Sequence, residues 1–179
     1  MVMIKKAAIN DALVLTNLAR NIYKDHYLHL WHPGGAEWYM NEYAYAMDKI
    51  KHELLDPGVA YFIAFEEGKP VGYLKLLLSA TLAGFETSGA LEVERIYLYK
   101  KDLGKGIGKQ LMQLAMQYAI ELKKDFIFLK AMDSSLSAIE FYEKLGYTII
   151  GDQQLPMPTF SLMKEAYRGM VILKKNIEK

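Results

Sequence analysis

Apolar residues recur along this chain in two patterns, one typical of strands and the other typical of helices. Short apolar runs that alternate, or that are rich in β-branched and aromatic residues, predict strands. The predicted strands cover Val2–Ala8, Val59–Phe65, Val71–Leu78, Leu91–Tyr99, Phe126–Ala131, Tyr147–Ile150 and Met170–Leu173. Apolar residues at helical spacing predict helices. The predicted helices cover residues 10–27, Trp38–Leu55, Ile107–Leu122 and Ala138–Leu145.

Glycine, proline and polar residues mark the places where these elements end. Glu66–Pro70 has turn chemistry and predicts a hairpin between the strands on either side. Ser79–Gly89 is small and flexible and is predicted as a loop, and Gly151–Tyr167, with two prolines, as a loop over a cleft. Because neither a repeat nor a linker divides the chain, we expect a single domain over residues 1–179, of the mixed α/β (α+β) class.

Composition narrows the choice of function. A net charge of +1 gives no basic field for nucleic acid. The absence of cysteine excludes disulfides, thiolate catalysis and Cys-based zinc sites. No apolar run is long enough to span a membrane, and Met1–Asn10 lacks the apolar core of a signal peptide. We therefore expect a soluble cytoplasmic protein.

The central feature of the pattern is a glycine-rich turn between a strand and a helix. Gly104, Gly106 and Gly108 follow the strand Leu91–Tyr99 and open the helix Ile107–Leu122. The first N–H groups of a helix are unpaired and carry partial positive charge, so they can bind a phosphate. Glycine lets the backbone approach such a ligand closely, and two flanking lysines would add charge. The alternative is that the glycines only cap the strand–helix junction.

Two common phosphate-binding patterns do not fit. The dinucleotide pattern requires glycine where Lys109 stands, and the P-loop requires Ser or Thr after Gly-Lys, where Gly106 and Gln110 stand. The remaining Gly-x-Gly-x-Gly resembles the acetyl-CoA pyrophosphate loop of the GNAT acetyltransferases, Gln/Arg-x-x-Gly-x-Gly/Ala. Leu103 departs from it, because the family prefers Gln or Arg at that place.

A second segment, Ala138–Tyr147, is similar to another GNAT signature, N-x-x-A-x-x-F-Y-x-K-x-G-F/Y. Ser135 takes the place of the usual Asn, so a coenzyme A contact there would be weaker or water-mediated. The resemblance implies one mixed, mostly antiparallel sheet flanked by helices and splayed at the central strand. It also implies acetyl-CoA as cosubstrate beside that strand. The implied cofactor-binding residues are Ile96, Tyr97, Leu98, Gly104, Lys105, Gly106, Ile107, Gly108, Lys109, Ser135 and Tyr142.

Two glutamates on the central strand are candidates for the base that deprotonates an amine. Glu92 and Glu94 share one face, because side chains in a strand repeat every second residue. The resemblance ranks Glu92 first, because several family members carry a catalytic carboxylate there. The alternative is that one or both pair with Arg95 or with a lysine of a neighbouring strand. The resemblance also implies that Tyr142 protonates the departing thiolate.

The segment from Tyr23 to Tyr45 is dense in aromatic residues. These either pack in the core or, for Tyr23, Trp31 and Trp38, line a substrate cleft where a cationic amine lies over ring faces. The nearby histidines lack an HExxH-type pattern, so we expect no metal, although His26 could contact substrate.

The residues and the resemblance together predict an N-acetyltransferase that acts on a primary amine of a small molecule by direct attack. Residues Leu91–Leu98 look most like the bacterial spermidine/spermine acetyltransferase branch, so polyamines come first. The alternatives are acetylation of a peptide amino terminus or a protein lysine, and a regulatory acyl-CoA-binding module that turns over poorly. We expect neither nucleic acid nor membrane as partner, and a homodimer stays open.

Overall fold

The computed structural model describes residues 1–178, without the side chains of residues 86–88. The strands are β1 (Val2–Lys6), β2 (Val59–Glu66), β3 (Lys69–Leu82), β4 (Phe85–Leu98), β5 (Phe126–Met132), β6 (Thr148–Gln154) and β7 (Gly169–Asn176). The helices are α1 (Ala12–His26), α2 (Gly35–Trp38), α3 (Met47–Leu55), α4 (Ile107–Glu121) and α5 (Leu136–Lys144). Among the described residues, no helix is both long and apolar enough to cross a membrane.

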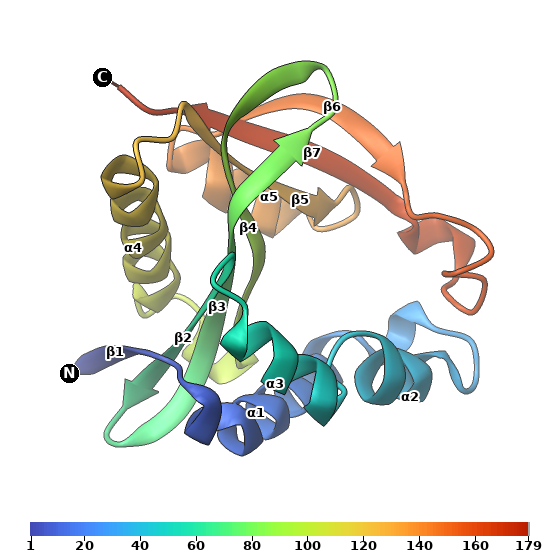
Figure 1. The fold of residues 1–179 in the computed structure, drawn as a ribbon. Coiled ribbons are helices and arrows are strands. Elements are labelled where there is room, and N and C mark those ends of the chain that lie inside the picture. Colours follow the sequence, from blue (N-terminus) through green and yellow to red (C-terminus); the bar gives the residue numbers. More distant parts are fainter. Residues whose placement is uncertain (179) are drawn as a thin grey trace.

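The strands form one seven-stranded sheet in the order β1-β2-β3-β4-β5-β7-β6. Every neighbouring pair is antiparallel except β4 and β5, which are parallel. In Figure 1, β4 runs through the centre of the molecule and joins the β1–β3 half to the half that holds β5, β6 and β7. The predicted mixed, mostly antiparallel sheet is confirmed.

The sheet opens at the parallel pair. Residues Ala90–Val93 of β4 pair with Phe126–Leu129 of β5. Beyond Val93, β4 stays on β3 as far as Leu98, whereas β5 continues along β7 to Met132. The predicted splay at the central strand is therefore confirmed, and residues 94–98 of β4 form what we call the open edge.

The two faces of the sheet carry separate hydrophobic cores. Helices α1 and α3 cover one face and pack against Tyr61 and Tyr73. Helices α4 and α5 cover the other face, where Leu74 and Leu91 lie fully buried. Burial of this apolar surface on both sides holds β4 rigidly in place up to the point where β5 leaves it.

A β-bulge changes which face the residues of β4 occupy. Lys75 of β3 lies opposite Arg95, but the next residue, Leu76, lies opposite Val93, so Glu94 is an extra residue. Val93 lies in the α4 and α5 core, whereas Glu94 and Arg95 both lie on the α1 and α3 face. A bulge of this kind also increases the local twist, at the place where β4 and β5 part.

The predicted helix Trp38–Leu55 is wrong in its middle. After α2, the chain makes a π-helical turn, Tyr39–Tyr43, and α3 begins only at Met47. Between them Tyr45 enters the core, with 1% of its surface exposed. The Arg20 side chain donates two hydrogen bonds to the Tyr45 carbonyl, at 2.8 and 3.1 Å, and so replaces the helical bond that this carbonyl loses.

Two predicted loops are partly strand. Within Ser79–Gly89, β3 continues to Leu82 and β4 begins at Phe85, around a turn at Gly84 with a φ of 82°. The hairpin is stabilised by the Phe85 ring on Phe126, at 5.4 Å, a contact between residues far apart in the sequence. Within Gly151–Tyr167, β6 extends to Gln154, because β7 pairs with it as far as that residue.

Candidate functional site

Alternate residues of β4 present their backbone groups to the open edge. The Tyr99 N–H donates to the Val71 carbonyl of β3 at 3.2 Å. In a planar trans peptide the C=O and N–H point in opposite directions, so the Leu98 carbonyl points to the open side. Because backbone groups alternate along a paired strand, those of Ile96 also point there and those of Tyr97 point to β3. This corrects the expected backbone role of Tyr97.

The glycine-rich turn lies directly after this edge. Gly104 and Gly106 have φ values of 77° and 81°, a left-handed conformation that favours glycine, and a side chain at either would enter open space. Gly106 is the N-cap of α4, so the N–H groups of Ile107, Gly108 and Lys109 have no partner within the helix. The predicted turn and helix start are confirmed, and their geometry suits an anion.

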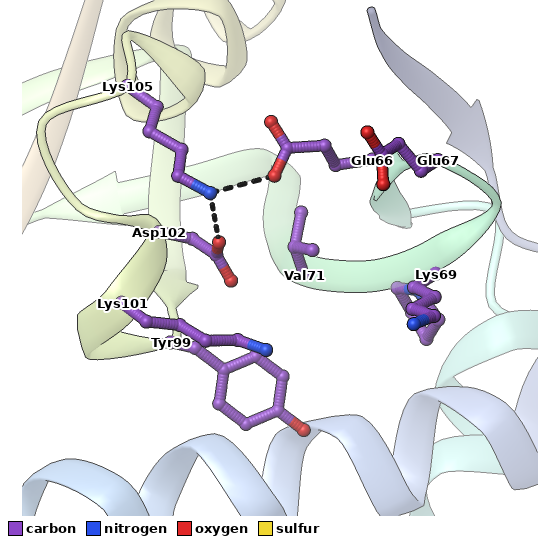
Figure 2. Close-up of a pocket in the computed structure, with 9 residues that line it drawn as sticks. Glu66, Glu67, Lys69, Val71, Tyr99, Lys101, Asp102 and Lys105 are labelled. Atoms are coloured by element: carbon purple, nitrogen blue, oxygen red, sulfur yellow. Dashed lines mark hydrogen bonds and ion pairs between the residues drawn. The ribbon is translucent and has the colours of Figure 1, made fainter.

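Lys105, within the glycine-rich turn, is paired with two carboxylates. Figure 2 shows its ammonium between the carboxylates of Asp102 and Glu66, at 2.7 and 2.8 Å. These hydrogen bonds raise the pKa of Lys105 above its ordinary value. A pocket of about 520 Å³ lies beside the pair, lined also by Tyr99. In this structure Lys105 therefore forms an ion pair that connects the glycine-rich turn to the end of β2, in place of the expected contact with phosphate.

The other residues expected to bind the cofactor differ in exposure. Lys109 is exposed on the first turn of α4. Ser135 is half-buried at the N-cap of α5, where its carbonyl accepts a hydrogen bond from the Ile139 N–H at 3.0 Å. Leu103, the departure from the loop motif, has 54% of its surface exposed, so its apolar side chain has little packing role.

The two glutamates have different surroundings. Glu92 lies on the part of β4 that still pairs with β5, and its nearest cation, Lys130 of β5, is 4.0 Å away. Burial raises the pKa of Glu92 above its ordinary value, and the charge of Glu94 adds to this while Lys130 opposes it. A carboxylate with a raised pKa is a stronger base near neutral pH than an exposed one.

Glu94 belongs instead to a buried ion network. Its carboxylate lies 2.5 Å from the Lys75 ammonium and 3.6 Å from the Arg95 guanidinium. Lys75 also binds Glu53 at 2.8 Å, and only 3% of the Lys75 side chain is exposed. Burial alone would raise the pKa of Glu94, but Arg95 and Lys75 lower it below its ordinary value. The predicted alternative, that one or both glutamates pair with Arg95 or with a lysine of a neighbouring strand, is confirmed closely for Glu94 and, at 4.0 Å with Lys130, for Glu92 as well.

Tyr142 is buried on α5, with 8% of its surface exposed. Burial raises the pKa of its hydroxyl above the ordinary value, and Tyr27 adds to the shift. Tyr27 directly follows α1 and Tyr142 lies on α5, so the two belong to opposite faces of the sheet. Tyr142 packs in the core under α4 and α5, where its buried hydroxyl stays neutral.

The aromatic residues expected at a substrate cleft are largely packed. Tyr23 and Trp31 are each 5% exposed, and the Trp31 indole N–H donates to the Tyr23 hydroxyl at 2.8 Å. Trp38 is half-buried against Tyr43 and Phe160, with ring centroids 5.0 and 6.1 Å away. Core packing thus accounts for Tyr23 and Trp31, and only Trp38 keeps exposed surface.

The segment between β6 and β7 crosses this aromatic cluster. Its Leu162 carbonyl accepts a hydrogen bond from the His32 N–H at 2.9 Å, and its Lys164 N–H donates to the Leu30 carbonyl at 2.8 Å. In Figure 1 the segment reaches from the upper half of the sheet to the region of α2. Of the predicted loop Gly151–Tyr167, residues 155–164 are confirmed as a loop, and Glu165–Tyr167 form a short helical turn.

Two lysines near the site, Lys75 and Lys130, were not among the residues expected from the sequence. Lys75 and Lys130 are lone charges within otherwise apolar strands, and that contrast was the available signal. Each lies next to one of the two glutamates. The Nε2 of His26, expected as a substrate contact, lies 2.8 Å from the Leu98 carbonyl on the open edge.

Comparison with known proteins gives a consistent result. The sequence model described as Acetyltransferase (GNAT) family matches residues 20–147. The protein named "Uncharacterized N-acetyltransferase in pepI 3'region" from Lactobacillus delbrueckii subsp. lactis is 31% identical over 126 residues, 66% of this chain and 71% of that protein. The Spermine/spermidine N(1)-acetyltransferase of Bacillus subtilis (strain 168) is 26% identical over 89 residues, 49% of this chain and 59% of that protein.

The fold also matches solved structures. PaiA N-acetyltransferase from Thermoplasma acidophilum, solved in complex with coenzyme A, superposes with a TM-score of 0.76 at 20% identity, over 99% of each chain. At that identity the match concerns the fold alone.

Proposed function

Because this chain belongs to the acetyltransferase (GNAT) family, we propose that it transfers the acetyl group of acetyl-CoA to a primary amine at the open edge of β4. One observation carries the proposal. The backbone groups of Ile96 and Leu98 point into the opening between β4 and β5, and the glycine-rich turn at the start of α4 follows directly. An open strand edge followed by a helix N-terminus suits a ligand such as acetyl-CoA, in which an arm that contains amide groups is joined to a pyrophosphate.

In this proposal the pantetheine arm of acetyl-CoA lies along the open edge, and Gly104–Lys109 bind the pyrophosphate through their N–H groups. The chemistry of the residues fits this division. Strand backbone supplies donors and acceptors for amides, and the start of α4 supplies donors and partial positive charge for an anion. Gly104 and Gly106 keep the surface of the turn free of side chains.

The reaction needs two proton transfers. The amine nitrogen attacks the thioester carbonyl carbon, the C–N bond forms, and the C–S bond breaks to release the coenzyme A thiolate. An alkyl amine with a pKa near 10 is mostly protonated at neutral pH, so Glu92, directly or through a water, removes a proton from it. Tyr142 then donates a proton to the thiolate. The raised pKa of Glu92 suits a base, and the raised pKa of Tyr142 keeps its hydroxyl protonated, so that it can donate a hydrogen bond to the departing sulfur.

Polyamines are the acceptors we propose first. The name of the Bacillus subtilis relative supports this class, and Glu92 offers a negative charge to a cationic amine. Glu94 contributes less to this attraction than the sequence suggested, because Lys75 and Arg95 neutralise it.

A coenzyme A release assay tests the proposal. The purified chain is incubated with acetyl-CoA and, separately, with spermidine, spermine, amino acids, aminoglycosides and peptides, and free thiol is measured. We expect release with a polyamine, rising with pH as the amine deprotonates. Turnover with peptides and with no other acceptor would mean that peptides, and not polyamines, are the acceptors. Tight acetyl-CoA binding in calorimetry without release from any acceptor would leave a regulatory acyl-CoA-binding module instead of an enzyme.

A further inference from the structure

Three consecutive residues at the end of α1 contact the end of β4. The Asp25 carboxylate accepts a hydrogen bond from the Lys100 N–H at 2.7 Å. The next residue, His26, lies with its Nε2 2.8 Å from the Leu98 carbonyl. The Tyr27 ring packs edge-on against the Tyr97 ring, with centroids 5.6 Å apart. One helical turn therefore contacts Tyr97, Leu98 and Lys100 at once.

The contact of His26 compensates for a missing strand. Residues Ala90–Val93 of β4 pair with β5, but β5 has left β4 before Leu98 is reached, so the Leu98 carbonyl has no partner there. An unpaired strand carbonyl in a partly buried place is costly, and His26 supplies the donor. Since a carbonyl can only accept, Nε2 must carry the proton in this hydrogen bond.

We propose that His26 is a positioning residue for acetyl-CoA and makes no contact with the acceptor amine. By binding the Leu98 carbonyl, it fixes the end of β4 and leaves the Ile96 groups and the Leu98 N–H free for the pantetheine arm. Asp25 fixes the next part of the chain, four residues before Gly104. This inference rests on the proposed function, since it assumes that the open edge binds acetyl-CoA.

A pair of substitutions at one position tests the role of the hydrogen bond. His26→Ala removes the donor, and His26→Gln keeps an N–H group at a similar reach. We expect His26→Ala to weaken acetyl-CoA binding by roughly 2- to 10-fold, the worth of one net hydrogen bond, and His26→Gln to restore most of it. The KM for the acceptor should stay at the wild-type value in both variants. Binding is measured by calorimetry with acetyl-CoA and with coenzyme A.

The matched control is His52→Ala, at an exposed histidine on α3, for which we expect wild-type binding. Asp25→Ala gives a second measurement at an exposed side chain, should His26→Ala fold poorly, and we expect it to weaken acetyl-CoA binding in the same direction.

Three results would overturn the inference. Unchanged acetyl-CoA affinity in both His26→Ala and Asp25→Ala is the first, and failure of His26→Gln to restore binding in a folded variant is the second. The third is a raised acceptor KM with unchanged acetyl-CoA affinity, because it would make His26 an acceptor contact. Loss of the proposed function itself would appear differently, as an absence of acetyl-CoA binding or turnover in the wild-type chain.

Discussion

Glu92 and Glu94 stand two residues apart on β4, and neutralising each should damage a different property. Glu92→Gln should slow catalysis and leave the fold intact. Glu94→Gln should weaken the fold and affect catalysis little while the chain stays folded. The difference follows from the partners: Glu92 has one cation at 4.0 Å, whereas Glu94 lies 2.5 Å from a lysine that is 3% exposed.

The size of the stability loss can be worked from these contacts. Removing one partner of a buried ion pair costs roughly 3–5 kcal/mol, because the other charge is left uncompensated. Lys75 keeps Glu53 at 2.8 Å, and 29% of the Glu94 side chain is exposed. For Glu94→Gln we therefore expect about 2–3 kcal/mol, which lowers Tm by about 4–12 °C in a chain of this size. For Glu92→Gln we expect no net loss, because the partly exposed pair with Lys130 is worth only about 0–1 kcal/mol and the burial of the Glu92 charge opposes it.

The pH dependence gives the sign of each effect. The pKa of Glu94 is lowered in the fold, so its charge stabilises the protein above its unfolded pKa of about 4.3. The cost of Glu94→Gln should be full at neutral pH and vanish as the pH falls through the folded pKa. The pKa of Glu92 is raised, so its ionised form lowers stability, and Glu92→Gln should gain stability relative to the wild type as the pH rises.

Thermal unfolding and coenzyme A release, each measured from pH 4 to 10, check the two properties together. At neutral pH we expect Glu92→Gln to lower kcat/KM by about 10²- to 10⁴-fold, as for a lost general base. Partial recovery should follow in alkali, where free amine is already present. A stable Glu94→Gln variant with that same activity profile would refute the reasoning and make Glu94 the base.

The remaining predictions concern Tyr142, the glycine-rich turn and the packing of β4. Tyr142→Phe should lower kcat by roughly 10- to 10³-fold with little change in acetyl-CoA affinity, and an unchanged kcat would make the hydroxyl structural. Gly106→Glu should abolish acetyl-CoA binding in calorimetry because an anion would face the pyrophosphate, whereas Gly106→Asn, which tolerates a positive φ without charge, should keep most of it. Gly72→Ala should cost about 1–3 kcal/mol in denaturant unfolding, because its Cβ would meet the Tyr97 carbonyl oxygen at 2.7 Å, and a neutral effect would contradict that contact.

Several features of this protein could be predicted from the sequence because they depend on residues close together in the chain. The positive φ values of Gly104 and Gly106 need only the absence of a side chain, and the helix that starts at Ile107 needs only its apolar period. Order and spacing of the two motifs, read together with the strands, were sufficient for the fold class. The expectation that the sheet opens at its central strand came from the family resemblance, because no local sequence pattern predicts it.

The tertiary structure decided which residues can act at that opening. Residues 80–90 form a hairpin that is stabilised by the contact between the Phe85 and Phe126 rings. The helix is interrupted between α2 and α3, where the Arg20 side chain donates hydrogen bonds to the Tyr45 carbonyl. Period-2 spacing makes Glu92 and Glu94 look equivalent, and only their partners on β3 and β5 distinguish them. Ion pairs and the hydrogen bonds that satisfy backbone carbonyls depend on strands and helices that are distant in the sequence. Which partners these groups have is therefore fixed only when the chain packs, and no local sequence pattern contains it.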